Sequence, residues 1–370
     1  MNSFLSNVIK GIDNTNILAD GGNSSEFTGT IDTGSYIMNA VLSGSLYGGV
    51  PNNKITAFAG ESATGKTFFV LGVIKQFLED NETGGIIYFD TEAAVTKDMM
   101  ASRGIDVSRV SIAEPESIED FRTSAVKMLT NYMEHKDAPP MMMVLDSLGQ
   151  LSSAKELEDV ESGKPARDMT KAQLLRGTFR VLSLKLAKAK VPLLVTNHVY
   201  DVVGSYIPMK EMSGGAGLKY ASSSIAMLSK KKDKDGTDVI GNIIKVQMAK
   251  SRFTQENKKV EVKLSYSTGL DRYYGLLDLA EKYDIIKKVS TRYELPDGTK
   301  VFGKNINQDP EKYFTEDMMV KLEEVAKKEF LYGESTDELS VDEGTEDSLC
   351  LLYTSPSPRD RTRSRMPSSA

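Results

Sequence analysis

Residues 60–67 constrain the fold of this 370-residue chain more than any other segment. They match the pattern G-x-x-x-x-G-K-[ST] and consist of Gly60, Glu61, Ser62, Ala63, Thr64, Gly65, Lys66 and Thr67. A short apolar run, ITAFAG (55–60), leads into the pattern, and FFVLGVIKQFLED (68–80), with apolar residues at helical spacing, follows it. A strand, a glycine-rich loop and a helix in this order predict a phosphate-binding loop, in which backbone N–H groups and the helix N-terminus face phosphate oxygens.

Further apolar strands alternate with helices along the chain. GGIIYFDTE (84–92), PPMMMVLDSLG (139–149) and VPLLVTNH (191–198) have the composition of buried strands, while residues 117–133 and 171–190 have helical spacing. This alternation predicts an α/β fold with a mostly parallel central sheet and helices on both faces. From about residue 220 the pattern changes to three consecutive strands, at 222–229, 239–249 and 259–265, of which the first two are joined by a turn containing Asp-Gly.

The residues around this loop suit the hydrolysis of a nucleoside triphosphate. Lys66 can reach the β and γ phosphates, and the Thr67 hydroxyl can take a coordination position on Mg²⁺. Asp146 ends an apolar strand, where its carboxylate can hold the Mg²⁺ through water. Glu92 ends another strand and can orient or deprotonate the attacking water. Asp90 competes for this role, but it lies two residues back, inside the strand.

Three more residues carry two interpretations each. His198 follows the strand at 191–198, where it either touches the γ-phosphate and reports its presence to the next loop or is simply a hydrogen-bonded residue at a strand end. The spacing does not separate these alternatives. Lys250 and Arg252, taken on spacing alone, are charges at the end of a strand.

Composition excludes several other classes of protein. No apolar run approaches the roughly 18–20 residues that span a bilayer, and the N-terminus has no secretory signal pattern, so we expect a cytoplasmic protein without a membrane partner. One cysteine, Cys350, and two histidines argue against a disulfide framework and a Cys- or His-built metal centre. The net charge is −6, with −7 in residues 334–347 and +3 in 348–370, so any DNA site must be a local basic surface.

The motifs together resemble those of the RecA-type recombinases. The P-loop, FDTE (89–92), VLDSLG (144–149), VTNH (195–198) and GGAGLKY (214–220) occur in the order of that family. LEDVESGKPARDMTKAQ (157–173) and AKSRFT (249–254) most resemble the UvsX-like strand-exchange recombinases of T-even-type bacteriophages. The resemblance covers residues 31–280, and more loosely extends to 333. It implies a RecA-type P-loop NTPase core with a mostly parallel central sheet, an N-terminal oligomerisation arm and a small C-terminal α+β domain.

The resemblance also implies the activity and its cofactors. Such a protein is a DNA-dependent ATPase that hydrolyses ATP with Mg²⁺. It forms a helical filament on single-stranded DNA and exchanges strands with homologous duplex DNA during homologous recombination, repair and recombination-dependent replication. A RecA-fold hexameric DNA helicase or motor is the alternative, and it predicts rings rather than open filaments. A nucleotide-binding module without turnover is a third interpretation, which the intact set of Lys66, Glu92 and Asp146 opposes.

Residue roles follow from the resemblance position by position. Glu92 matches the catalytic glutamate, Asp146 the Walker B acid, and His198 the polar sensor that couples the nucleotide to the second DNA loop. Lys250 and Arg252 match basic residues that reach a neighbouring subunit's nucleotide. One position departs from the pattern, because Met99 stands where the family has a tyrosine that stacks on adenine; a thioether can still pack on a ring.

Two segments match the DNA-binding loops, near 158–167 and 199–213. Neither is strongly basic, so phosphate contacts are few per subunit and binding depends on repetition along a filament. The residues that we expect to contact DNA are Lys164, Arg167, Tyr200, Tyr206, Lys210, Gly214 and Gly215.

These observations divide the chain into five parts. Residues 1–30 match an arm that docks on the adjacent subunit, with a helix at 4–12, although a disordered terminus is the alternative. Residues 31–269 form the ATPase core and 270–333 the small C-terminal domain. Residues 334–347 are an acidic tail, which either competes with DNA for basic surfaces or is only solvated. Residues 348–370 resemble sequencing-adapter read-through and are expected to be non-native, the alternative being a functional basic tail.

The resemblance finally implies partners and a location. Besides copies of the chain itself and DNA, it implies a single-strand-binding protein and a recombination mediator. A phage-encoded protein of this kind would act in the cytoplasm of the host cell.

Overall fold

A large sheet forms the centre of the computed structural model, which describes residues 28–164, 170–201, 210–235, 238–265 and 269–333, together with Lys10. Its ten strands lie in the order β12-β11-β10-β9-β3-β7-β6-β4-β5, with β8 paired to β7. The strands that pair in parallel are β3 (Ile55–Gly60), β4 (Gly85–Asp90), β5 (Val110–Ala113), β6 (Met141–Asp146), β7 (Leu193–Asp201) and β9 (Ser224–Asp235). The predicted α/β fold with a mostly parallel central sheet is confirmed.

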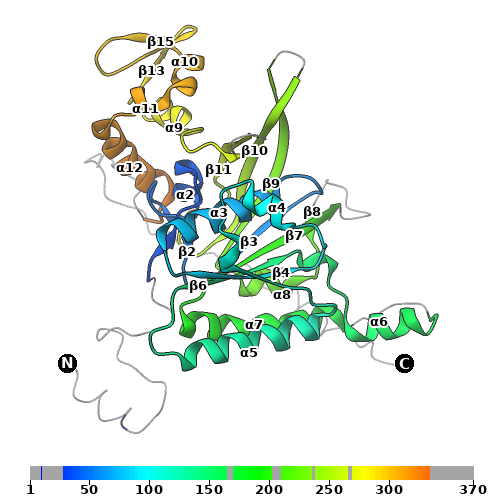
Figure 1. Cartoon of the computed structure of the whole chain (residues 1–370). Coiled ribbons are helices and arrows are strands. Elements are labelled where there is room, and N and C mark those ends of the chain that lie inside the picture. The colour runs from blue at the N-terminus through cyan, green and yellow to red at the C-terminus, as the bar shows by residue number, and fades with distance from the viewer. Residues whose placement is uncertain are drawn as a thin grey trace, which may run out of the picture. The chain divides into compact units, whose positions relative to one another are not determined.

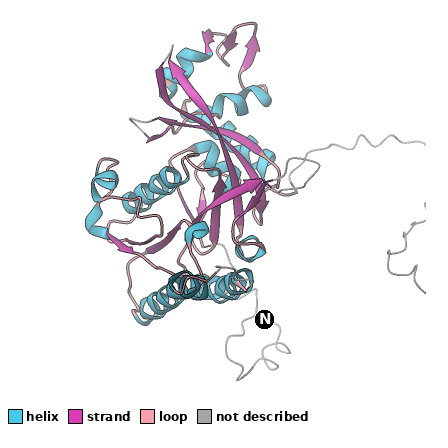
Figure 2. Ribbon diagram, turned by 90° about the vertical axis from the view of Figure 1, so that its right-hand side faces the viewer, coloured by secondary structure: helices cyan, strands magenta, loops and turns pink. Residues whose placement is uncertain are grey.

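The sheet becomes antiparallel at the side that begins with β9. Here β9 pairs with β10 (Asp238–Ser251), β10 with β11 (Lys259–Ser265), and β11 with β12 (Gly269–Leu270). The β9–β10 pair is long and projects from the sheet as a hairpin (Figures 1 and 2). These strands lie where the sequence predicts three consecutive strands, and the first two extend further into the lysine-rich turn than expected.

Helices cover both faces of the sheet. On one face α5 (Ile118–Glu134) and α7 (Lys171–Ala189) lie side by side, with α8 (Ala216–Ala221) beside α7 (Figure 1). The other face carries α2 (Tyr36–Ser43) and α3 (Lys66–Asp80). Because neighbouring residues of a strand point to opposite faces, Tyr88 joins the core under α3 and Phe89 the core under α5.

Shorter elements connect the layers. They are β1 (Thr30–Ile31), β2 (Val50–Pro51), α4 (Lys97–Ala101), a 3₁₀ turn at Val107–Arg109, another at Leu148–Gln150, α6 (Ala154–Glu161) and β8 (Lys210–Met212). Of the described residues, no helix is long and apolar enough to cross a membrane.

The segment after β12 is small and mixed. It contains α9 (Leu276–Lys282), β13 (Lys287–Val289), β14 (Arg292–Glu294), β15 (Lys300–Phe302), α10 (Gly303–Gln308), α11 (Pro310–Tyr313) and α12 (Glu316–Phe330). The hairpin expected around RYELPDGTKVFG is β14–β15, which β13 extends to three strands. The Glu329 carboxylate in α12 accepts hydrogen bonds from Lys258, Lys282 and Tyr283.

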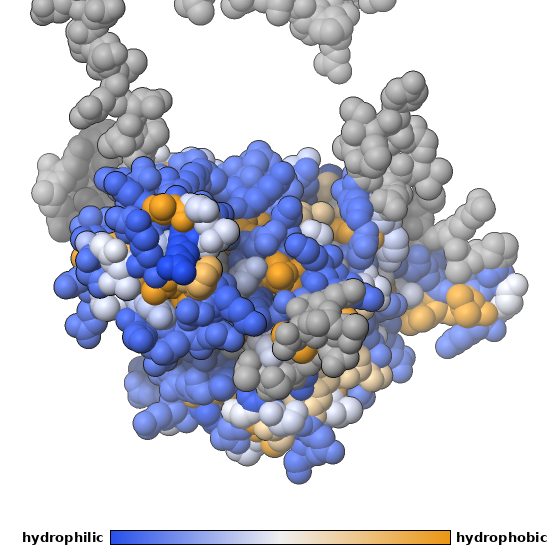
Figure 3. Space-filling view, turned by 90° about the horizontal axis from the view of Figure 1, so that it is seen from above, coloured by the Kyte–Doolittle hydropathy of each residue, from blue (hydrophilic) through white to orange (hydrophobic). Residues whose placement is uncertain are grey.

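The face seen from above is mostly hydrophilic, with small separate hydrophobic spots (Figure 3).

Both predicted DNA loops begin later in the chain than expected. The first was expected to begin near residue 158. Instead, Ser153 and Glu156 form a capping box that starts α6, and this helix continues to Glu161. The second was expected to begin at Val199, but β7 continues to Asp201 and pairs with β8. The predicted helix at 4–12, apart from Lys10, and the tails at 334–347 and 348–370 lie outside the described residues.

Candidate active site

The P-loop connects β3 to α3 with the geometry that phosphate binding requires. Gly65 precedes the helix with φ of +90°, a left-handed conformation that favours glycine. A Cβ on Gly60 would lie 2.7 Å from the backbone oxygen of Leu228, so the close approach of β9 also requires glycine. The Lys66 ammonium donates to the backbone oxygens of Gly60 (3.0 Å) and Glu61 (2.9 Å). Burial lowers the pKa of Lys66, and the carboxylates of Glu92 and Asp146 partly offset this effect.

Asp146 lies beside the P-loop, as predicted. Its Oδ2 accepts a hydrogen bond of 2.7 Å from the Thr67 hydroxyl, which joins the end of β6 to the start of α3. The same oxygen accepts another bond of 2.7 Å from the Tyr88 hydroxyl, and Oδ1 accepts one from the Thr196 hydroxyl. The sequence analysis identified neither Tyr88 nor Thr196 as part of the site, because each lies inside an apolar strand that indicates core packing.

Glu92 belongs to a polar group at the ends of three neighbouring strands. Its Oε1 accepts a hydrogen bond of 2.5 Å from the Ser147 hydroxyl and lies 3.0 Å from His198 Nε2. Burial by itself raises the pKa of Glu92, but the hydrogen bonds from Ser147 and His198 bring the pKa below its ordinary value. Glu92 is therefore an ionised acceptor at neutral pH, which a general base must be.

Asp90 has a different environment from Glu92. Its side chain is buried, and its two oxygens accept backbone N–H groups of Glu92 (3.1 Å), Ala94 (3.4 Å) and Val95 (3.1 Å). These bonds hold the loop that presents Glu92. Of the two acids weighed from the sequence, Glu92 is the one that faces the P-loop cavity.

A cavity of about 170 Å³ lies between these groups. Residues from the P-loop, α3, the loop after β4, α4, β6 and β7 line it: Ser62, Ala63, Gly65, Lys66, Thr67, Phe68, Glu92, Ala94, Met99, Asp146 and His198. Met99 therefore lies where the sequence places it. Phe68 was not predicted; one face of its ring carries the Arg103 guanidinium, 4.4 Å from the ring centre. The donor set of one ammonium, one hydroxyl and two carboxylates fits a magnesium-bound triphosphate.

The cavity connects directly to the base of the second predicted loop. The His198 backbone oxygen accepts a hydrogen bond of 2.9 Å from Ser213 N–H, and the neighbouring Asn197 amide donates to the Ser213 oxygen. Lys210, predicted to contact DNA, forms an ion pair with Glu61 of the P-loop, which lowers the pKa of that carboxyl through a hydrogen bond and charge. Lys230 donates to the backbone oxygen of Ala63.

Lys250 and Arg252 lie away from the P-loop of their own chain. Lys250 pairs with Ile225 on β9, three residues before Leu228, which lies opposite Gly60. The separation is roughly 10 Å along the strands and roughly 10 Å across them. Lys250 Nζ instead donates to backbone oxygens of Lys219 (2.7 Å) and Ser222 (2.7 Å) at the end of α8. Arg252 is exposed.

The other predicted DNA contacts fall into three groups. Lys164 and Tyr200 are exposed, whereas Arg167 and Tyr206 lie outside the described residues. Gly214 and Gly215 precede α8 with positive φ, beside a groove of about 530 Å³ between α7 and α8. Arg176 and Arg180 line this groove, and the sequence analysis missed both. Their four-residue spacing, which places them on one face of a helix, is the signal that could have identified them.

Comparison with known proteins identifies relatives of this chain. The family model described as the RecA N-terminal domain matches residues 1–271. A recombination and repair protein of Enterobacteria phage T4 is 29% identical over 252 residues, which cover 68% of this chain and 63% of that protein. A RecA protein of Chloroherpeton thalassium is 31% identical over 265 residues, covering 70% of this chain and 69% of that protein.

A longer match supports the same assignment. A RecA protein of Levilactobacillus brevis is 25% identical over 354 residues, which cover 94% of this chain and 88% of that protein. The predicted resemblance to RecA-type recombinases, and among them to a phage recombinase, is thereby confirmed. Since the family model covers most of the chain, including every residue placed in the cavity, this chain is a member of the RecA family of recombinases.

Proposed function

We propose that this chain is an ATP-dependent DNA strand-exchange recombinase that forms helical filaments on single-stranded DNA. The observation that carries the proposal is that the P-loop cavity is joined to the base of the second predicted DNA loop, through the Glu92–His198 contact and the His198–Ser213 backbone bond. A nucleotide that changes the first contact also changes the base of the loop. The proposal places this activity in the cytoplasm, with a single-strand-binding protein and a mediator as partners.

The side chains supply the chemistry of hydrolysis in a defined order. Lys66 exchanges its two backbone acceptors for phosphate oxygens. The P-loop N–H groups donate hydrogen bonds to the same negatively charged phosphates. Thr67 and Asp146 would hold Mg²⁺, which would supply positive charge to offset that of the phosphates. Glu92 accepts a proton from the attacking water, and Ser147 keeps its carboxylate oriented.

Two features support completion of the site by a second subunit. The exposed Arg252 and the half-buried Lys250 lie too far from their own P-loop to reach its phosphates. Burial lowers the pKa of Lys250, with the nearby Arg252 charge adding to this effect. We propose that both residues approach a neighbour's γ-phosphate, in the manner of an arginine finger.

The base of the nucleotide has a candidate platform in this cavity. Met99 and Phe68 both line the cavity, and Arg103 lies over one face of the Phe68 ring. We propose that adenine packs against Met99 and Phe68, which replace the tyrosine of the family pattern. A thioether and an aromatic edge both provide polarisable contacts for a purine.

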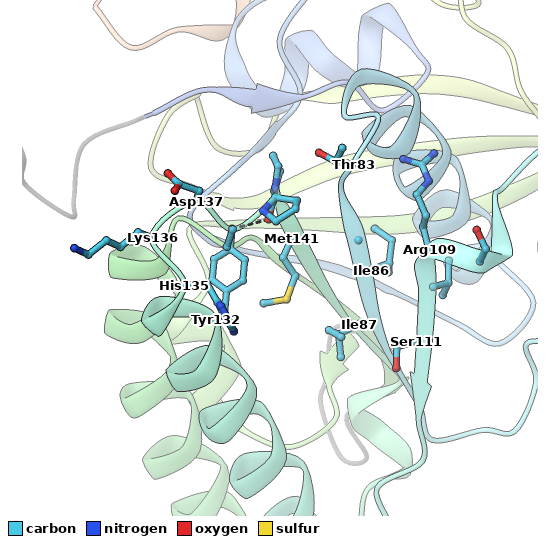
Figure 4. Close-up of a pocket in the computed structure, with 16 residues that line it drawn as sticks. Thr83, Ile86, Ile87, Arg109, Ser111, Tyr132, His135, Lys136, Asp137 and Met141 are labelled. Carbon is cyan, nitrogen blue, oxygen red and sulfur yellow. Dashed lines mark hydrogen bonds between the residues drawn. The ribbon is translucent and has the colours of Figure 1, made fainter.

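We propose that the N-terminal arm of a neighbouring subunit docks in a groove beside β5, the last strand in the order of the sheet. The groove has a volume of about 820 Å³ and lies between β4, β5 and the end of α5 (Figure 4). Among the described residues, β5 has a hydrogen-bonded strand on one side only, and Ile112 on it is 44% exposed. An open strand edge with an apolar side chain is suited to the addition of an extended segment.

Electron microscopy tests the proposal directly. With a non-hydrolysable ATP analogue and single-stranded DNA, the chain should form open helical filaments. Ile112→Glu should prevent them without loss of nucleotide binding, because a buried charge at the β5 edge opposes docking. Thr123→Glu, which adds the same charge at an exposed position on α5, serves as the control. Closed rings would favour the helicase alternative. Single particles that do not assemble with DNA and nucleotide would refute both the recombinase and the helicase interpretation.

The groove between α7 and α8 yields a separate prediction. Arg176→Ala should weaken binding of single-stranded DNA to a similar degree for different sequences, because its guanidinium is placed to contact phosphate. The slope of log affinity against log salt concentration should fall by about one per subunit. Lys127→Ala on α5 removes an equal charge elsewhere and should leave the slope unchanged. A loss confined to one DNA sequence would contradict this role.

A further inference from the structure

The Asp146 carboxylate has an unusual number of hydroxyl neighbours. Asp146 is 4% exposed, and its two oxygens accept hydrogen bonds from Thr67, Tyr88 and Thr196. Thr67 belongs to the P-loop motif, but Tyr88 and Thr196 belong to strands on either side of β6. We define Tyr88 and Thr196 as the hydroxyl pair.

The sheet brings the hydroxyl pair to the carboxylate. Parallel β4, β6 and β7 are adjacent, and Asp146 lies opposite Asp90 in the β4–β6 register. Tyr88, two positions earlier on β4, points to the same face as Asp90 and reaches up to Asp146 with its ring. Thr196 follows Val195, which pairs with Leu145, so its short side chain lies beside Asp146.

Both members of the pair are built into the core. Tyr88 and Thr196 are each 0% exposed, so neither hydroxyl has water as an alternative partner. The Tyr88 hydroxyl donates to Oδ2 of Asp146 over 2.7 Å, and a phenol is protonated at neutral pH. A buried donor aimed at a buried carboxylate is an ordered, charge-assisted contact.

Counting acceptor positions shows what this arrangement leaves open. An ionised carboxylate has about four lone-pair positions, two on each oxygen. Thr67 and Tyr88 occupy those on Oδ2, and Thr196 occupies one on Oδ1. One position on Oδ1 remains for a hydrogen donated by a water molecule of a bound cation.

We propose that Tyr88 and Thr196 are positioning residues that hold the Asp146 carboxylate in the rotation needed for its open Oδ1 position to receive a Mg²⁺-bound water. The pair thereby sets how tightly the site holds magnesium together with nucleotide. This inference rests on the proposed ATPase function and adds two residues that the P-loop and Walker B patterns do not include. Outer partners of metal-binding carboxylates commonly change metal affinity about tenfold or more when removed.

The test is a magnesium titration of nucleotide binding, which does not depend on turnover. A fluorescent non-hydrolysable ATP analogue is added to the full chain at increasing Mg²⁺ concentrations. Tyr88→Phe keeps the ring and removes only the hydroxyl, and it should raise the Mg²⁺ concentration for half-maximal binding about tenfold. Binding of the analogue without Mg²⁺ should change less than about twofold, because the P-loop is untouched.

Matched variants separate positioning from packing. Thr196→Val should act in the same direction as Tyr88→Phe, and Thr196→Ser, which keeps a hydroxyl, should restore the wild-type requirement. Tyr283→Phe removes a hydroxyl that donates to the Glu329 carboxylate, in the segment after β12, and should have no effect. Thr56→Val is a second control, since the buried Thr56 hydroxyl has no hydrogen-bond partner among the residues that the structure describes.

The outcomes distinguish a failure of the positioning role from a failure of the proposed ATPase function. If the wild-type chain binds the analogue with Mg²⁺ but Tyr88→Phe and Thr196→Val need no more Mg²⁺ than wild type, the positioning role is overturned and the ATPase proposal stands. If the wild-type chain binds no analogue at any Mg²⁺ concentration, both are overturned. Should Tyr88→Phe fail to fold, the comparison of Thr196→Val with Thr196→Ser decides alone.

Discussion

Replacing Lys66 with alanine should abolish DNA-stimulated ATP hydrolysis and the formation of stable filaments. Lys66 is 7% exposed, and its ammonium donates to two P-loop carbonyl oxygens, which phosphate oxygens can replace. Its loss removes a preorganised positive charge from a site with two carboxylates, so we expect turnover to fall by at least about a hundredfold. Phosphate release with single-stranded DNA measures turnover, and electron microscopy measures assembly.

The Lys66→Ala variant should remain folded. An ammonium in this position is costly to bury, so its removal should not lower the temperature of unfolding. Lys75→Ala is the matched control, because Lys75 lies on the same helix, α3, but forms only a surface pair with Glu79. Normal hydrolysis by Lys66→Ala would refute the assignment of this loop.

Replacing Arg252 with alanine should preserve nucleotide binding by the single chain and remove DNA-stimulated hydrolysis. The register of β9 and β10 keeps Arg252 away from its own P-loop, so the loss should appear only where two subunits meet. Arginine residues that act in trans on a transferred phosphate contribute roughly a thousandfold or more to turnover. Arg292→Ala removes the same charge from the small sheet and should retain full activity.

Mixing two inactive variants tests this trans role more sharply. Glu92→Gln lacks the proposed base, and Arg252→Ala lacks the proposed trans charge, so neither should hydrolyse ATP alone. In a random equal mixture, about a quarter of the head-to-tail interfaces combine an intact Glu92 from one subunit with an intact Arg252 from the next. Recovery of hydrolysis toward that fraction supports the interface site. A mixture as inactive as its components would contradict it.

Much of the site could be predicted because its chemistry depends on local sequence. A phosphate-binding loop needs a strand, glycines with positive φ and a helix start within a few residues, and residues 55–80 contain all three. Asp146 and Glu92 could be placed because both follow apolar strands, and the carboxyl ends of parallel strands meet at one edge of a sheet.

The boundaries of the predicted loops were less accurate, because short helices and strand extensions depend on weaker signals. The capping box at Ser153 and Glu156 can be recognised in the sequence, yet the last residues of α6 were predicted to belong to a loop. The extension of β7 to Asp201 depends on pairing with β8, which is nine residues further along the chain, and so could not be inferred from β7 itself.

By itself, the sequence determined the α/β class, the P-loop, and the acids Glu92 and Asp146, since strand, loop and helix signals are all contained in short stretches. The tertiary structure alone decided which hydroxyl groups surround those acids, that Lys210 meets Glu61, and that Arg176 lines a groove beside α8. These contacts join residues that are 40 or more positions apart, as with the 58 positions between Tyr88 and Asp146. Their existence depends on strand order and register, which long-range packing sets and local patterns do not encode.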